Sequence, residues 1–454
     1  MFNAATLAIA RTTFTEAVRQ PVVLALVLLS GILQILNTWN TGYSLGYSTM
    51  ETSEVTADDK LLFDIGLSTI FVVGTILAGL AATAVISREI ENKTVLTIVS
   101  KPVSRVSLII GKYLGVAGVT LISCVIMMVF LMMALRHGVM STAADEVDMP
   151  VIVFGLGGVG VSLLVGAWCN YYYGWSFPQT SLLLMLPLML AGWVGTLIFN
   201  EKWEVQGLLH DVKPQVLTAC FSLVLAILVL SSVATAASTR LNQVLTIVVC
   251  VGVFLGALLS NYFVGRWVFR NEILGRVDSV SRVDPDRTFV EQSPVELKLR
   301  SPLPRSLPAG TPVYYSPSPN GFPLMNEEDY RPFDGSLENI NDVMGPAAKG
   351  PAIVAVSGAD QTIVLRNVGP RPVAVQRPPE RGDYVFTRPT RVNYPLLAVW
   401  GSLPNLQHFW LLDAVSQNHP VPLEYSLLSV VYAIVLIVAC LSLGVIMFQR
   451  RDVG

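Results

Sequence analysis

Long apolar runs separated by short polar segments make up most of the chain. The first, Pro21 to Trp39, carries no charge and approaches the roughly 20 residues that a helix needs to cross a bilayer core about 30 Å thick. Seven further runs of similar character lie at residues 64–86, 113–135, 151–169, 181–199, 217–238, 244–263 and 425–448. The pattern predicts an α-helical polytopic membrane protein with about eight transmembrane helices. Residues 3–19 place apolar and basic positions on different faces, which predicts a helix lying along the membrane surface.

The distribution of Lys and Arg predicts which ends of these helices face the cytoplasm, because short cytoplasmic loops are enriched in both residues. Ten of them lie at one end of the expected spans, and four lie in the short loops at the other end. The ten are Arg11, Arg19, the five between Arg88 and Lys112, Arg240, Arg450 and Arg451. We therefore expect both termini to lie in the cytoplasm.

One loop, residues 170–180, carries no charge, so only the alternation of spans places it in the cytoplasm. Its Tyr171, Tyr172, Tyr173 and Trp175 are typical of the aromatic belts that mark a membrane–water interface. A platform on which a substrate stacks is the alternative interpretation of the same four residues.

Between residues 265 and 424 the composition changes to a Pro-rich, charged sequence about 160 residues long, which is far longer than an ordinary loop. Short β-rich pieces broken by Gly and Pro predict a large, mostly β extracytoplasmic domain, a sandwich or barrel-like module inserted before the last helix. Residues 303–331, with six prolines, are expected to form an irregular excursion outside the ordered core, and residues 396–412 to lie along the outer membrane interface. The β-rich pieces are residues 288–299, 311–315, 352–356, 362–368, 373–376 and 383–387.

The expected organisation therefore has three parts. Residues 1–264 form the N-terminal helix and a seven-span transmembrane region, residues 265–424 the extracytoplasmic domain, and residues 425–454 the final span with a cytoplasmic tail.

Several function classes are disfavoured by what the sequence lacks. It contains no Gly-x-x-x-x-Gly-Lys-Ser/Thr phosphate loop, so the chain does not bind ATP by the usual motif. No Asp, Glu, Lys or Arg lies in the middle of an expected span, which disfavours proton-coupled transport, and a net charge of −2 provides no basic field for nucleic acid. The five cysteines include no Cys-x-x-Cys pair, and the spacing of His408, Asp413 and His419 gives no fixed set of metal ligands. We therefore expect neither a metal site nor a catalytic site.

A charged island, residues 87–105, separates the second and third expected spans. Ile90, Val95, Ile98 and Val99 recur at about helical spacing among charged positions, which predicts a short amphipathic helix. Pro102 would end this helix. Composition alone indicates a cytoplasmic loop whose charges fix the topology.

The order of residues in this island resembles a signature of type-2 ABC transporter permeases. It reads Ser-Arg-Glu-Ile-Glu, then Lys-Thr-Val-Leu, Ser-Lys-Pro-Val-Ser-Arg and Ile-Ile-Gly-Lys-Tyr-Leu-Gly, and it is most similar to the branch of multi-copper-enzyme maturation and gliding-motility permeases. The resemblance implies that residues 88–105, called the coupling segment below, bind a separate ATPase. The motif positions are held by Arg88, Glu89, Glu91, Thr94, Lys101, Pro102 and Arg105. Lys93, Val95 and Ile98 add charge and an apolar face suited to a groove on a partner.

The same resemblance implies a permease subunit of an ATP-driven exporter, a homodimer bound to two ABC ATPase subunits in a bacterial cytoplasmic (inner) membrane. ATP and Mg²⁺ would lie on the ATPase, with no cofactor and no enzymatic activity in this chain. One alternative is a mechanotransmission or assembly complex in which ATP hydrolysis moves the outer domain. Another is a receptor-like membrane anchor whose outer domain binds an extracytoplasmic partner protein. Eight spans and a large outer domain depart from the six spans and modest loops common in the family, and the sequence does not indicate the substrate.

Overall fold

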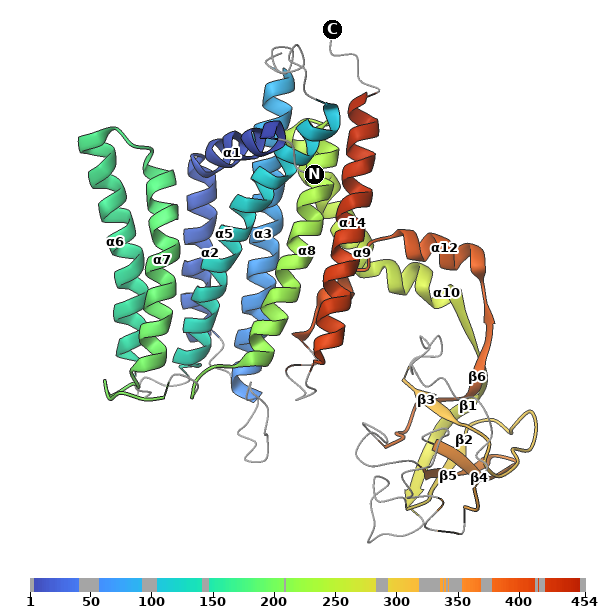
Figure 1. The fold of residues 1–454 in the computed structure, drawn as a ribbon. Helices are drawn as coiled ribbons and strands as arrows, with labels where there is room; N and C mark the ends of the chain where they lie inside the picture. Colours follow the sequence, from blue (N-terminus) through green and yellow to red (C-terminus); the bar gives the residue numbers. More distant parts are fainter. Residues whose placement is uncertain are drawn as a thin grey trace. The chain divides into compact units, whose positions relative to one another are not determined.

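The structure is a computed structural model of the whole chain (Figure 1). It describes residues 4–40, 57–91, 104–140, 147–207, 210–282, 293–317, 335–337, 339, 342, 353–368, 378–412, 415 and 421–449. The chain forms two compact units. One is a helical unit of Met1–Leu258 and Asn405–Gly454, and the other is a second unit of Leu259–Pro404.

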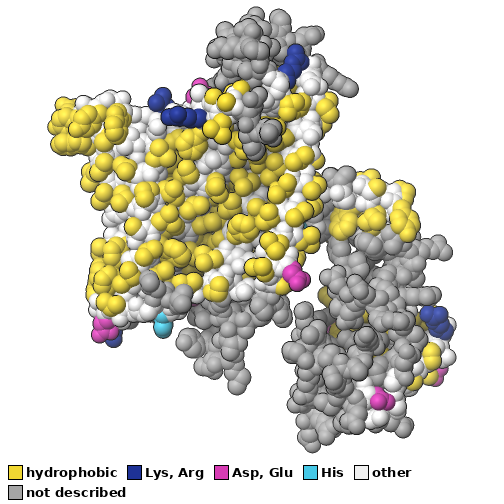
Figure 2. Space-filling model, viewed as in Figure 1, with side chains coloured by type: hydrophobic (Ala, Val, Ile, Leu, Met, Phe, Trp, Pro, Cys, Tyr) yellow, Lys and Arg dark blue, Asp and Glu magenta, His cyan; other side chains and the backbone are white. Residues whose placement is uncertain are grey.

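Among the described residues, eight helices are long and apolar enough to cross a membrane, which confirms the predicted number of spans. They are α2 (Pro21–Asn40), α3 (Ala57–Glu91), α5 (Arg105–His137), α6 (Met149–Tyr173), α7 (Phe177–Ile198), α8 (Pro214–Ser238), α9 (Gln243–Ser260) and α14 (Leu423–Gln449). Apolar side chains cover the visible outside of the helical unit (Figure 2), as expected for helices surrounded by lipid. The chain is therefore a multi-pass membrane protein.

The N-terminal helix α1 (Ala4–Val18) packs closely on the first half of α5. A Cβ atom added at Gly115 would lie 2.5 Å from the Thr13 Cβ atom and 2.7 Å from the Ala10 carbonyl oxygen. Glycine at this position thus lets the two backbones approach one another. Figure 1 shows α1 running across the spanning helices near one of their ends, as predicted for a helix at the membrane surface.

The core of the helical unit lies among α3, α5 and α8, where Leu77, Ile126 and Ile227 are all 0% exposed. In contrast, only 17% of the α6 span is buried, against 67% of the spans of α3 and α8. Helix α6 forms a hairpin with α7, and α7 makes most of the contact with α5. The α6 face therefore remains open to lipid or to a partner.

Two predicted loops are shorter than expected because the helices continue beyond the apolar runs. Helix α5 begins at Arg105 rather than Tyr113, so Lys112 lies within the helical unit, 4% exposed, with its Nζ donating to the Val85 carbonyl oxygen at 3.4 Å. Lys112 lies near the start of the 33-residue helix α5, so the prediction that no Asp, Glu, Lys or Arg lies in the middle of a span is not contradicted. The uncharged 170–180 loop is reduced to a turn in which Gly174, with φ of 66°, ends α6.

The second unit contains one six-stranded antiparallel sheet with the strand order β3-β6-β1-β2-β5-β4. The strands are β1 (Phe269–Arg282), β2 (Val295–Leu299), β3 (Tyr314–Ser316), β4 (Ile353–Ala359), β5 (Thr362–Asn367) and β6 (Tyr384–Val392). This confirms the predicted β-rich region before the last helix. Of the two predicted forms, the single sheet agrees with the barrel-like module and not with a two-sheet sandwich. The longest strand, β1, was not among the predicted pieces, and residues 373–376 lie outside the described part of the chain.

The prediction about the Pro-rich stretch needs correction. Leu307 and Val313, from the Pro-rich stretch expected to lie outside the core, are 5% and 0% exposed within the core of the sheet. The remainder of that stretch, residues 318–331, lies outside the described residues.

Residues 405–412 belong to the stretch that was predicted to lie along the outer membrane interface, a position that the structure does not test. They pack into the core of the helical unit, where Leu406 and Phe409 of the short helix η3 (Leu406–Phe409) are 3% and 1% exposed. The Trp410 ring lies 6.2 Å from that of Phe71 on α3. The preceding helix, α12 (Tyr394–Ser402), belongs to the second unit.

Candidate coupling site

The coupling segment connects the end of α3 to the start of α5. The apolar span of α3 ends at Val85, and the helix continues to Glu91, so the backbones of Arg88, Glu89 and Glu91 form its last turns. Only Arg105 has a described side chain among the predicted site residues. Six of the predicted site residues lie outside the described part of the chain: Lys93, Thr94, Val95, Ile98, Lys101 and Pro102.

Helix α5 has a well-defined start, which fixes the position where the segment ends. Ser104 is the N-cap, and its Oγ accepts a hydrogen bond from the Ser107 backbone N–H at 3.0 Å. The two hydroxyl groups also lie 2.8 Å apart. The Lys112 contact with Val85 holds α5 against α3 just inside this start. The structure therefore brings together the two ends of the coupling segment.

Arg105 joins the coupling segment to the last helix of the chain. Its Nη1 donates to the Gln449 carbonyl oxygen at 2.9 Å, and its guanidinium carbon lies 5.9 Å from the centroid of the Phe448 ring. The last carbonyl groups of a helix lack partners within the helix and form the negative end of its dipole. Arg105 thus supplies a hydrogen bond and a compensating charge at the end of α14.

A second arginine binds the same end of α14. Arg240, in the turn after α8, donates from Nε to the Met447 carbonyl oxygen at 2.8 Å. Nearby, a Cβ atom added at Gly444 would lie 3.1 Å from the Ala236 Cα atom, which shows how closely α14 approaches α8. The end of α14 is therefore held by residues from two other connections. The sequence analysis counted Arg240 only as a topological charge.

The other end of α14 is bound through His408. The Tyr425 hydroxyl donates to the His408 carbonyl oxygen at 2.7 Å and lies 3.0 Å from its Nδ1, while the Ser429 Oγ lies 3.1 Å from its Nε2. Burial lowers the pKa of His408, which favours the neutral ring. His408 therefore has a structural role in a network with α14. No group of three His, Cys, Asp or Glu residues in the described chain is placed to hold a metal ion.

An arginine cluster ties four helices together at the opposite end from Arg105. The Arg136 guanidinium contacts the Asp148 carboxylate at 3.1 Å, the Asp211 carboxylate at 3.6 Å and the Phe199 carbonyl oxygen at 2.5 Å. Partial burial favours a higher pKa for Asp211, but hydrogen bonds with His210 and Gln206 and the charge of Arg136 outweigh it, so this pKa lies below its usual value. The cluster joins the ends of α5 and α7 to the starts of α6 and α8.

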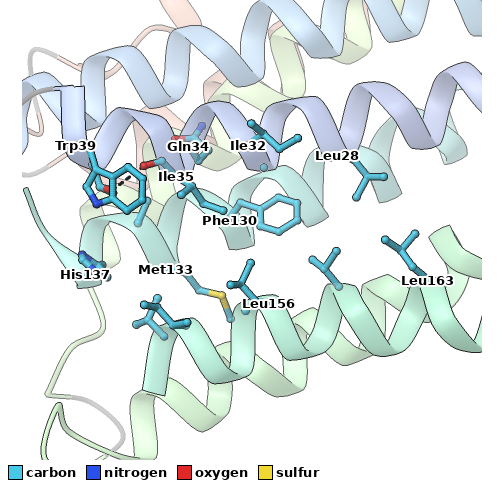
Figure 3. Close-up of a pocket in the computed structure, with 17 residues that line it drawn as sticks. Leu28, Ile32, Gln34, Ile35, Trp39, Phe130, Met133, His137, Leu156 and Leu163 are labelled. Atoms are coloured by element: carbon cyan, nitrogen blue, oxygen red, sulfur yellow. Dashed lines mark hydrogen bonds between the residues drawn. The ribbon is translucent and has the colours of Figure 1, made fainter. Parts of the chain in front are cut away.

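An apolar cavity of about 510 Å³ lies between α2, α5 and α6 (Figure 3). Leu28, Phe130 and Leu156 lie on its walls, and Trp39 and His137 lie at one end (Figure 3). A cavity with these walls suits an apolar group rather than a charged one. It provides no arrangement of groups for covalent chemistry.

Comparison with known proteins found one family model that is similar to the region around the coupling segment. Residues 7–167, which run from α1 through most of α6 and include the whole segment, match the model of the ABC-2 family transporter protein. No curated protein and no solved structure gave a significant match. The match covers the region in which the sequence signature was found, although it does not identify the branch. Residues 7–167 are therefore similar to the type-2 ABC transporter permeases, as the sequence signature predicted.

Proposed function

We propose that this chain is the permease subunit of an ABC exporter, in which the coupling segment binds a separate ATPase subunit and transmits its movement to α14. The observation that carries the proposal is the position of Arg105. This residue ends the segment, begins α5 and binds the end of α14 at Gln449. A displacement of the segment would therefore move two spanning helices together.

The proposal requires the Arg105 end of the helical unit to face the cytoplasm. The excess of basic residues supports this orientation, because ten Lys and Arg lie in the segments at this end and four in the short loops at the other. Both termini would then be cytoplasmic, and the second unit extracytoplasmic. We place the protein in a bacterial cytoplasmic membrane on the basis of its family.

The ATPase would supply the energy for transport. In the proposed complex, a homodimer of this chain binds two ATPase subunits, and both ATP and Mg²⁺ bind to those subunits. The chain itself would bind the ATPase through the charged and apolar residues of the coupling segment, among them Glu89 and Val95. Its task is mechanical, and its substrate would pass between rearranged spanning helices.

Mechanical transmission without transport is a second candidate, and one observation favours it. Residues 405–412 directly follow the second unit, and they are bonded to α14 through His408. Movement of α14 could thus be passed to the connection that leads to the β-rich unit. Substrate-stimulated ATP hydrolysis in proteoliposomes distinguishes the two candidates, because only a transporter responds to a transported molecule.

Binding of the ATPase is tested by a charge reversal. The full chain is co-expressed with a candidate ABC ATPase from the same organism, and the complex is purified through a tag on the ATPase. Glu89→Lys places a like charge against any cationic partner and should reduce co-purification. Membrane insertion should be unaffected, because Glu89 lies beyond the apolar span of α3. Normal co-purification of both Glu89→Lys and the Val95→Asp/Ile98→Asp double variant would overturn the proposal.

Transmission is tested separately from binding. In a background without the five native cysteines, an exposed cysteine at Ser442 of α14 is labelled with an environment-sensitive probe, and ATP is added to the complex. In complexes of Arg105→Gln that still contain the ATPase, the ATP-dependent signal should be lost. Arg11→Gln, on the exposed face of α1, is the control and should keep the signal. A full signal from Arg105→Gln would show that α14 does not receive movement through this residue.

A further inference from the structure

A polar cavity of about 540 Å³ lies where the end of α1 meets the turn between α6 and α7. Its walls include Arg19, Asn170, Trp175, Ser176, Gln179 and Thr180. None of the described residues lining the cavity is acidic. The described walls of the cavity therefore combine hydrogen-bonding groups with one positive charge and no negative charge, and they include no residue of α14.

The guanidinium of Arg19 is oriented although the residue is exposed. Its Nε donates to the Gln179 Oε1 at 2.8 Å, which holds the group at the wall of the cavity. Within the described chain this is the one hydrogen bond recorded for the Arg19 side chain, so its Nη groups are available to a ligand. An arginine with two planar N–H groups available is suited to bind phosphate oxygens in a bidentate manner.

The surrounding turn is built from the cavity's own polar residues. The Asn170 Nδ2 donates to the Trp175 carbonyl oxygen at 2.5 Å. The Thr180 hydroxyl donates to the Ser176 carbonyl oxygen at 3.0 Å. The Ser176 side chain makes no capping hydrogen bond to α7. Its hydroxyl can therefore serve as a further donor toward a ligand.

Exposed aromatic side chains indicate the depth of the cavity in the membrane. Tyr171, Tyr172, Tyr173 and Trp175 are 82%, 58%, 66% and 57% exposed at the end of the α6–α7 hairpin. Trp and Tyr exposed at the ends of spanning helices concentrate at the level of the lipid headgroups. Because Trp175 also lines the cavity, the cavity opens at this level. The phosphate groups available there belong to phospholipids.

We propose that this cavity binds the phosphate headgroup of an anionic phospholipid. Arg19 would bind the phosphate oxygens, and the hydroxyl and amide groups would bind the polar remainder of the headgroup. The lack of an acidic residue on the described walls disfavours lipids with a cationic headgroup, because the choline or ethanolamine nitrogen would find no carboxylate. Basic pockets between helices on the cytoplasmic side are established sites for anionic headgroups. A bound lipid would connect α1 to the α6–α7 hairpin.

The test uses the full chain purified in detergent. It is titrated with phosphatidylglycerol, with phosphatidylcholine or with inorganic phosphate, and bound molecules are counted by native mass spectrometry. Wild type should bind phosphatidylglycerol more tightly than phosphatidylcholine. Arg19→Gln should weaken phosphatidylglycerol binding about fivefold, which corresponds to one basic side chain near the lipid surface, and should remove the selectivity. Arg11→Gln removes an exposed arginine of the same helix outside the cavity, and its selectivity should match wild type.

Three results would overturn the proposal. They are equal binding of the two lipids by wild type, unchanged selectivity in Arg19→Gln, and displacement of phosphatidylglycerol by millimolar inorganic phosphate, which would assign the cavity to a free anion. Should Arg19→Gln fail to fold, Gln179→Glu provides the second test, because a carboxylate would pair with Arg19 and repel the phosphate. The proposal then requires Gln179→Glu to lose selectivity, and retained selectivity overturns it.

Discussion

Replacement of Arg136 by Met gives the sharpest test of what holds the helical unit together. The Arg136 side chain is 11% exposed and that of Asp148 is 1% exposed, so the change leaves a buried carboxylate without its cation. Removal of one partner from a buried ion pair costs about 3–5 kcal/mol. Asp211 is 27% exposed and keeps its hydrogen bonds with His210 and Gln206, so the loss of its contact with Arg136 adds little to the destabilisation. We therefore expect Arg136→Met to destabilise the protein by about 3–5 kcal/mol.

The companion change, Asp148→Asn, should cost less. Asp148 is also the N-cap of α6, with its Oδ1 accepting from the Val151 N–H at 3.1 Å, and an Asn side chain can keep this bond. Arg136 would retain Asp211 and the Phe199 carbonyl. Loss of one hydrogen bond between charged groups then suggests about 1.5–3 kcal/mol. In the double variant, Arg136→Met/Asp148→Asn, the buried carboxylate is absent. The free energy of unfolding should therefore decrease by less than the sum of the two single decreases, with a difference of about 0.5–3 kcal/mol.

These values can be measured by equilibrium unfolding of the purified chain in mixed micelles of mild detergent and dodecyl sulfate. Arg300→Met is the control, because Arg300 and Asp278 form an ion pair at 3.7 Å with both side chains about half exposed. Such a pair contributes at most about 1 kcal/mol. The reasoning is refuted if Arg136→Met costs no more than Arg300→Met, or if the costs of Arg136→Met and Asp148→Asn simply add.

Three further predictions follow from the packing, the pKa of one histidine and the charge asymmetry. Gly115→Val should separate α1 from α5 and lower the midpoint of unfolding, whereas Gly160→Val, where a Cβ atom meets nothing within 4 Å, should leave it unchanged. Burial lowers the pKa of His408 from 6.5, so the folded state favours the neutral ring. The free energy of unfolding should therefore be highest above about pH 6.5 and decrease as the pH falls below that value. His408→Gln should remove this pH dependence. In spheroplasts of a cysteine-free background, Ser316→Cys should react with an impermeant maleimide and Ser104→Cys only after permeabilisation; equal labelling of the two would contradict the proposed topology.

The spans were predictable because the bilayer imposes a simple requirement on each of them. A helix that crosses lipid needs about 20 apolar residues, and charged residues interrupt such a run visibly. The requirement does not determine where a helix ends in water. Helix α3 therefore continues beyond Val85 to Glu91, and α5 begins before its apolar run, at the cap provided by Ser104. The burial of Lys112 escaped prediction for the same reason.

The longest strand escaped prediction because its pairing is irregular. Strand β1 shifts register against β6 at three places and against β2 at one. Each shift interrupts the alternation of buried and exposed positions on which strand prediction rests. Leu274, Gly275 and Val277 are consequently buried without a regular period of two. Strand β5, which has no shift against β2, shows regular alternation and was predicted within one residue of its end.

The coupling site shows a more fundamental limit of sequence reasoning. The motif pointed to Arg105, but it did not point to the end of α14, which lies 344 residues further along the chain. Arg105 and Arg240 both donate to backbone carbonyl groups, those of Gln449 and Met447. A carbonyl is present whatever side chain follows it, so neither position carries a residue type that would reveal the contact. The physical information lies in the two arginines and in the end of a helix, whose unpaired carbonyls accept hydrogen bonds from any donor that reaches them. If the proposed transmission operates, it should therefore depend on Arg105 and Arg240 and tolerate changes of the Gln449 side chain.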